Sequence, residues 1–183
     1  MKRIISILAV LALVLSAACA AFADGQDFTT AYFTLKLPEN WIIDTEDLEK
    51  KEGEESLGFF GDDREGGLVG AAYLVYYEEL KDFALWNADE QGLQAYTDTL
   101  LEEFADLSPV SLGTVMAGKV PLVLIRCSDE EGEFVYADTV TNGYTIQFEF
   151  YVPDDETEKM LPVTDECIEQ IKAILETFAP VGA

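Results

Sequence analysis

Residues 120–178 constrain the fold most, because two different hydrophobic periods follow one another there. Along 144–151 apolar and polar residues alternate, the two-residue period of a strand with one buried face. Asn142 and Gly143 precede this strand and favour a tight type I′ hairpin, because both central residues of such a turn adopt positive φ. Along 167–178 the apolar residues recur at helical spacing instead. We therefore expect an amphipathic helix that packs on three antiparallel strands, at 120–127, 133–140 and 144–151.

The rest of the chain shows the same two kinds of pattern. A second helix is expected after Asn87 or Asp89, where apolar residues again follow helical spacing. Its buried stripe comprises Leu93, Tyr96, Leu100, Phe104 and Leu107. Further strands are predicted at 32–37, 41–43, 57–60, 68–77 and 110–116. We therefore expect a short polar lead at 24–30 and one α+β domain at 31–180, with a mostly antiparallel sheet of seven to eight strands flanked by two principal helices.

The N-terminus has the features of an export signal. Two cations precede an apolar run at 4–15, which is too short to span a bilayer, and a small–x–small cleavage pattern follows at 21–23. We expect residues 1–23 to be a signal peptide, so that the mature protein is secreted, periplasmic or otherwise extracytoplasmic. The alternative is a lipoprotein anchored through Cys19, although Ser16 stands where the usual lipid-attachment motif has an aliphatic residue.

The expected mature chain is strongly acidic. Cleavage would remove two of the 11 Lys and Arg and no acid, so 9 cations would face 36 Asp and Glu, a net charge of −27. Nucleic acid and anionic membrane surfaces are excluded as partners, because both are bound through clusters of Lys and Arg. Cationic partners, divalent metal ions, or a charge that serves only solubility remain.

Two cysteines, Cys127 and Cys167, lie in the expected mature chain. In an oxidising compartment an even number of cysteines indicates a disulfide. Each of them also lies on or beside an apolar stripe, where a free cysteine is a common small core residue. The sequence therefore leaves open whether they form a bridge.

Three local phrases resemble those of PsbP-like domains. Phe33-Thr-Leu-Lys-Leu-Pro38 followed by Trp41 resembles their opening strand. Gly118-Lys-Val-Pro121 resembles their turn into the hairpin, and Ile174-Leu-Glu-Thr-Phe178 resembles the end of their last helix. The resemblance covers about residues 31–180.

The resemblance implies an α/β/α sandwich around an antiparallel sheet. The family includes an extrinsic subunit of photosystem II, a Ran-binding regulator of nuclear import and many secreted bacterial proteins. Its better-understood members are accessory or binding proteins rather than enzymes. None of their binding residues matches a position of this chain, so the resemblance implies a fold and a binding role but no site.

The chain contains no histidine, which excludes Ser-His-Asp and Cys-His catalysis and histidine-containing zinc sites. No phosphate-binding loop, dinucleotide fingerprint or nucleophile elbow is present. We expect no catalytic residue and no cofactor, and a secreted non-enzymatic accessory domain that binds an unknown protein or envelope partner. A carboxylate-based hydrolase is one alternative, since pairs of carboxylates arise readily among so many acids. The sequence does not indicate the oligomeric state.

A calcium-binding exported protein is the other alternative. Hard cations bind several oxygens on flexible loops, and two acidic turns offer such oxygens. The candidate ligands are Asp62, Asp63, Asp129 and Glu131. Neither turn has the spacing of an EF-hand, and acids are also common in turns that only contact water.

Two features suggest where a partner would bind. We expect both helices to cover one face of the sheet, which leaves the other face to its polar residues. These are Thr34 and Lys36 on an early strand and Thr145, Gln147, Glu149 and Tyr151 on a late one. Tyr151 is the strongest candidate, because tyrosine combines a broad apolar ring with a polar tip. The second feature is a group of aromatic and acidic residues at 76–86, which forms either a partner surface or a corner of the core.

Overall fold

A computed structural model describes residues 25–46, 48, 50–51, 54–62, 64, 66–154, 156–157 and 159–181. The predicted signal peptide at 1–23, the alternative anchor Cys19 and the calcium candidate Asp63 lie outside these residues. In the described part of the chain, no helix is both long and apolar enough to cross a membrane.

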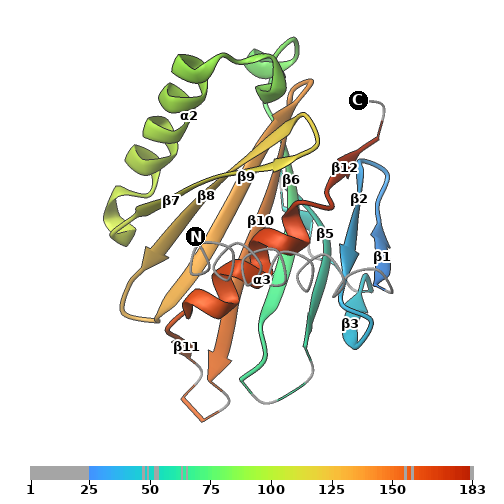
Figure 1. Cartoon of the computed structure of the whole chain (residues 1–183), viewed down its shortest axis with the longest axis vertical. Helices are drawn as coiled ribbons and strands as arrows, with labels where there is room; N and C mark the ends of the chain where they lie inside the picture. The colour runs from blue at the N-terminus through green and yellow to red at the C-terminus, as the bar shows by residue number, and fades with distance from the viewer. Residues whose placement is uncertain are drawn as a thin grey trace, which may run out of the picture.

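A large antiparallel sheet forms the centre of the molecule (Figure 1). Seven strands cross it in the order β3-β5-β6-β10-β9-β8-β7, and short strands β4 and β11 pair with β5 and β10. Their bounds are β3 Trp41–Asp44, β4 Lys50–Lys51, β5 Glu54–Asp62, β6 Val69–Tyr76, β7 Val110–Ala117, β8 Val120–Ser128, β9 Glu133–Thr141, β10 Tyr144–Asp154 and β11 Lys159–Leu161. The expected antiparallel α+β architecture is confirmed.

Strand β10 lies in the middle because both of its edges are paired. From Tyr144 to Tyr151 it pairs with β9 on one side and with β6 on the other. The β9–β10 hairpin is as tight as predicted, since Asn142 and Gly143 are its only loop residues, with φ of 50° and 87°. Positive φ at both positions is what a type I′ turn requires.

A second, three-stranded sheet consists of β1 (Gln26–Thr29), β2 (Phe33–Leu37) and β12 (Ala179–Pro180), in the order β1-β2-β12. The expectation of a polar lead at 24–30 is wrong, because β1 occupies most of it and buries Phe28 to 1% exposure. Its pattern is hard to recognise in sequence, since it contains one apolar residue in four. Thr34 and Lys36 therefore lie on this small sheet, and their predicted place on the face of the main sheet is also wrong.

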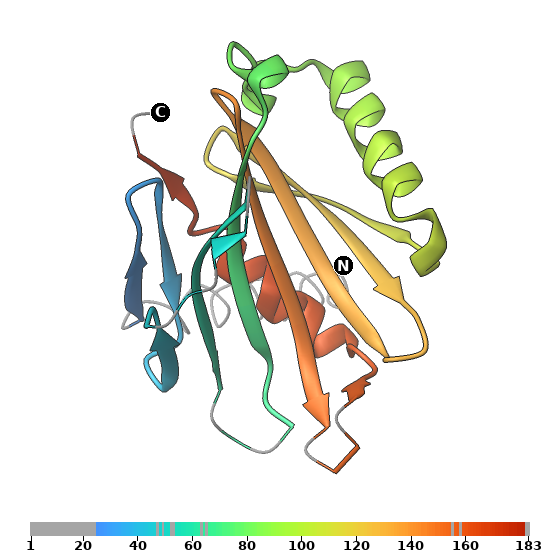
Figure 2. The same ribbon diagram turned by 180° about the vertical axis from the view of Figure 1, so that it is seen from behind.

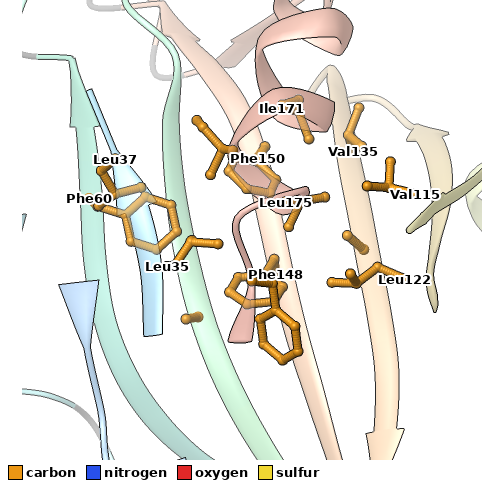
Figure 3. Packing of buried hydrophobic residues seen from close by; sticks show 14 of the residues in the cluster. Leu35, Leu37, Phe60, Val115, Leu122, Val135, Phe148, Phe150, Ile171 and Leu175 are labelled. Carbon is orange, nitrogen blue, oxygen red and sulfur yellow. The ribbon is translucent and has the colours of Figure 1, made fainter. Parts of the chain in front are cut away.

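Helix α3 (Asp165–Leu175) and the small sheet cover one face of the main sheet (Figure 1). Thr164 caps the helix by accepting a hydrogen bond from the Cys167 amide. Ile171 and Leu175 point from the helix toward Phe148 and Phe150 of β10 (Figure 3). All four side chains are fully buried, and each such burial contributes about 1.5–3 kcal/mol to folding.

Helix α2 (Glu90–Glu103) covers part of the opposite face (Figure 2). The expectation that both helices cover one face is wrong, and the reason lies in the strands. In β8, Leu122 and Leu124 belong to the core under α3, while Val123 and Ile125 belong to the core under α2. Because the residues on both faces of β8 are apolar, each face of the sheet must be shielded from water by its own packed elements. The arrangement is the α/β/α sandwich that the family resemblance implies.

The second face is covered only in part. The 3-10 turns η1 (Glu78–Leu80) and η2 (Leu85–Asn87) lead into α2, and η3 (Ala105–Leu107) follows it. With these turns, α2 lies over the β7–β9 side of the sheet (Figure 2). Of the helices that the structure describes, none lies above the side formed by β5, β6 and β10. The candidate site lies along this boundary.

Candidate functional site

Two adjoining hollows lie between α2 and the uncovered strands. The first has a volume of about 550 Å³ and lies against α2 and η1, with Phe83 and Tyr96 in its wall. The second, of about 580 Å³, lies over β6 and β10, with Tyr73 and Phe104 in its wall. Three residues line both hollows: Tyr77, Glu103 and Gln147. We treat the two hollows as one site and call it the α2 groove.

Asp138 of β9 lies at the floor of the groove and has no exposed surface. Tyr96 of α2 donates a hydrogen bond to its Oδ1, and Tyr136 of β9 donates one to its Oδ2 at 3.0 Å. Residues 136 and 138 share a face because side chains alternate along a strand. Gln147 lies directly across the ladder on β10, so the carboxyl group is held from three elements.

Burial is the largest cause that raises the pKa of Asp138 to about 7, because a charged carboxylate loses its hydration there. The nearby charge of Glu103 acts in the same direction. Hydrogen bonds from Tyr96, Tyr136 and Gln147 oppose both effects, since they stabilise the charged form. Burial also raises the pKa of both tyrosines, so their hydroxyls stay protonated and donate.

The charged residues that line the α2 groove, within the described part of the chain, are all acidic. They are Glu54, Glu79, Glu103, Asp138 and Glu149. Burial raises the pKa of Glu149, and it raises that of Tyr73 to about 12, with the charge of Glu149 as a second cause. These side chains therefore make the groove a region of negative potential with aromatic walls.

Three of the four predicted partner-face residues of β10 line the groove. Gln147 lines both hollows, Thr145 lines the first and Glu149 the second. Tyr151, half-buried against the core under α2, lines a third hollow of about 290 Å³ beside the exposed side chain of Ile42. The four residues thus follow one another along β10, although Thr145 is buried at 4% exposure rather than solvated.

Of the aromatic group at 76–86, Tyr76, Tyr77 and Phe83 line the groove. Trp86 instead packs toward the other core, with the Lys119 ammonium 5.3 Å from its ring centroid. Sequence reasoning missed Asp138, Tyr136 and Glu103 as site residues. The signal for Asp138 was present, because an acid in the middle of an apolar strand needs a hydrogen-bonded place in the core.

Of the described calcium candidates, Asp62 and Asp129 have carboxylates engaged in local contacts, and Glu131 contributes its backbone amide to one of them. The Arg64 guanidinium and its backbone N–H donate to Asp62, and this lowers the pKa of that carboxyl. Asp129 accepts from the amides of Glu131 and Gly132 at 2.8 and 3.2 Å, which closes its own turn. Among the residues that the structure describes, no group of three or more Cys, Asp or Glu side chains could hold a metal ion.

Cys127 and Cys167 are both free. Cys127 is buried in the core under α2, whereas Cys167 packs against the core under α3. The main sheet therefore lies between the two thiols, and the bridge that the sequence left open is not formed.

No family model matches the chain, and neither does any curated protein. Among solved structures, it is similar to a protein from Bacteroides thetaiotaomicron VPI-5482, with a TM-score of 0.45 and 14% identity over 85% of this chain. The match spans only 48% of that protein. A second similar structure is the cyanobacterial PsbP (CyanoP) of Synechocystis sp. PCC 6803, with a TM-score of 0.43 and 11% identity over 85% of this chain and 91% of that one. TM-scores and identities this low carry neither a function nor a site across to this chain.

Proposed function

We propose that this chain is an exported accessory domain that binds a ligand or partner in the α2 groove and catalyses no reaction itself. The observation that carries the proposal is the groove with Asp138 at its floor. Concave sites with aromatic walls and a few fixed polar groups are typical of binding sites. Much of the groove is formed by a helix and a sheet, which hold side chains more rigidly than loops do.

The surroundings of Asp138 favour binding over catalysis. A general acid or base must come within hydrogen-bond distance of the proton that it transfers. Asp138 has no exposed surface, and both of its oxygens accept from tyrosine hydroxyls. In our proposal it positions the rings of Tyr96 and Tyr136, which form part of the wall. A carboxylate-based hydrolase gains no support from this residue.

The proposed place of action is outside the cytoplasm, on the basis of the export signal expected at 1–23. There, a domain with a strong negative charge stays soluble and repels other acidic surfaces.

The experiment is photo-crosslinking in the cells that produce the protein. The photoreactive residue benzoylphenylalanine replaces Thr99, an exposed residue on the groove wall of α2. The control replaces Glu169, an exposed residue of α3 on the opposite side of the sheet. We expect an adduct at position 99 and none at 169, and we expect Ala95→Trp to abolish it, because Ala95 lines the same wall. The absence of an adduct at 99, or equal adducts at both positions, would refute the groove as the binding site.

A further inference from the structure

The charges that line the α2 groove all have one sign in the described residues. Glu79 and Glu103 belong to the first hollow, and Glu54, Glu103 and Glu149 to the second. The hollows adjoin and share Glu103, so a ligand that extends from one into the other meets carboxylates along its whole length. Charge complementarity therefore requires a ligand with more than one positive group.

The walls add a second constraint on the ligand. Tyr73, Tyr76 and Tyr77 line the groove on the β6 side, and Phe83, Tyr96 and Phe104 line the side nearer to α2. Tyr76 and Tyr77 remain 46% and 37% exposed, which is high for large aromatic side chains. The faces of aromatic rings attract cations, and the planar guanidinium group both stacks on such rings and pairs with carboxylates.

Asp138 is an independent observation that points to the same chemistry. It is a carboxyl group without exposed surface, and its direct partners are neutral hydrogen-bond donors. No Lys or Arg of the described chain lines either hollow. The charged form of a carboxyl group buried without a positive partner is costly, and a cation in the groove above Asp138 would stabilise that form.

We propose that the α2 groove binds a basic peptide segment of a partner protein, with two arginine side chains entering the two hollows. This inference rests on the proposed binding function and names the class of partner. A peptide fits better than a small molecule because both hollows are open to solvent rather than enclosed, whereas small-molecule sites bury most of their ligand. In an extended peptide, arginines at alternate positions project from the same side at a spacing of about 7 Å, and can enter neighbouring hollows.

The test is fluorescence anisotropy with a labelled peptide of sequence Gly-Arg-Gly-Arg-Gly and the whole mature protein. The matched probe replaces both arginines by citrulline, which has nearly the same shape and no charge. We expect the citrulline peptide to bind at least about tenfold more weakly, because hydrogen bonds between charged groups are much stronger than neutral ones. Binding of the arginine peptide should weaken as salt rises, although less steeply than for a fully exposed site.

Three single-charge variants separate groove binding from general attraction to an acidic protein. Glu103→Gln and Glu149→Gln each remove one carboxylate from the groove, and Glu169→Gln removes one from the exposed surface of α3. We expect a loss of about three- to tenfold in affinity for each of the first two and of less than about twofold for the third. Circular dichroism and thermal melting of each variant establish that it is folded before binding is measured.

Several outcomes would overturn the inference. If the arginine and citrulline peptides bind equally well, the positive charge of the peptide does not determine its affinity. An equal loss from Glu169→Gln identifies the binding as nonspecific. Spermidine that competes as strongly as the arginine peptide at equal concentration reassigns the groove to small polyamines. If no peptide binds while position 99 still forms its adduct, the partner class is wrong and the binding function stands. If both experiments fail, the groove is not a binding site.

Discussion

At Asp138, a carboxyl group is enclosed by two tyrosine hydroxyls that come from different elements. Tyr136 is two positions away on the same strand, whereas Tyr96 is 42 positions away on α2. The contact with Tyr96 fastens the helix to the sheet by a polar bond in an otherwise apolar interface. It also makes the ionisation of Asp138 depend on the position of α2 relative to the sheet.

Replacing Asp138 by asparagine should change how stability depends on pH. The folded-state pKa of about 7 is above the ordinary value of 3.8, so between these two values the folded state holds a proton that the unfolded state has lost. Stability of the parent therefore falls as pH rises through this window, by up to roughly 1.4 kcal/mol per pH unit from this group. The asparagine side chain does not titrate, so urea unfolding at about pH 4.5, 6 and 8 should find Asp138→Asn gaining on the parent as pH rises.

The control for the Asp138 variant is Asp98→Asn, which removes one negative charge from the exposed surface of α2. Its stability relative to the parent should stay nearly constant across the same pH values. A difference between Asp138→Asn and the parent that does not change with pH would contradict the assignment of a buried, titrating carboxyl group.

At the scale of the element, α2 forms one wall of the groove and is defined by its first turn. Asp89 accepts a hydrogen bond from the Gly92 amide at 2.8 Å, which satisfies one of the free N–H groups at the start of the helix. The negative charge of Asp89 is also favourable at this end of the helix. The helix has a modest apolar stripe, so its position depends on this cap as well as on packing.

Asp89→Ala should lower the free energy of unfolding by about 1 kcal/mol, since the cap is lost and nothing replaces it. Chemical unfolding followed by circular dichroism measures the change. The matched control is Glu102→Ala, at the other end of α2, where loss of a negative charge is neutral or slightly stabilising. If the two substitutions cost the same, the cap does not define the start of the helix.

At the scale of the whole molecule, the main sheet separates two hydrophobic cores, which differ in how fully they are covered from solvent. The core under α3 is closed by the helix and the small sheet, and it contains most of the fully buried aromatic side chains. The core under α2 is closed on one side only, and its open boundary is the α2 groove. In our proposal the binding site lies at this open boundary, so substitutions of exposed groove residues such as Glu103 should be tolerated by the fold.

Calcium at about 1 mM should raise the melting temperature no more than sodium chloride of the same ionic strength does. An ion that only screens charges acts through ionic strength, whereas an ion that binds the folded state specifically adds further stability. We expect no specific binding, because the carboxylates of Asp62 and Asp129 already accept hydrogen bonds within their own turns. Differential scanning calorimetry of the mature protein with the two salts makes the comparison. A clearly larger rise with calcium would restore the calcium-binding alternative.

The sequence by itself determined the elements whose patterns are local. The alternation at 144–151, the turn at Asn142 and Gly143 and the helical stripe at 167–178 each specify a structure through residues close together in the chain. This is because side-chain direction in a strand or helix follows from the backbone period alone. The same period places Thr145, Gln147, Glu149 and Tyr151 on one face of β10, and their role as a partner face stays a prediction.

Only the tertiary structure decided which elements meet. It placed the helices on opposite faces, paired β1 with β2 and β12, and put the sheet between Cys127 and Cys167. It also brought Tyr96 to Asp138 and so formed the floor of the groove. These contacts join residues far apart in the chain. Each of them depends on how the elements pack so that every apolar face is buried at the same time. A pattern of neighbouring residues does not contain this information.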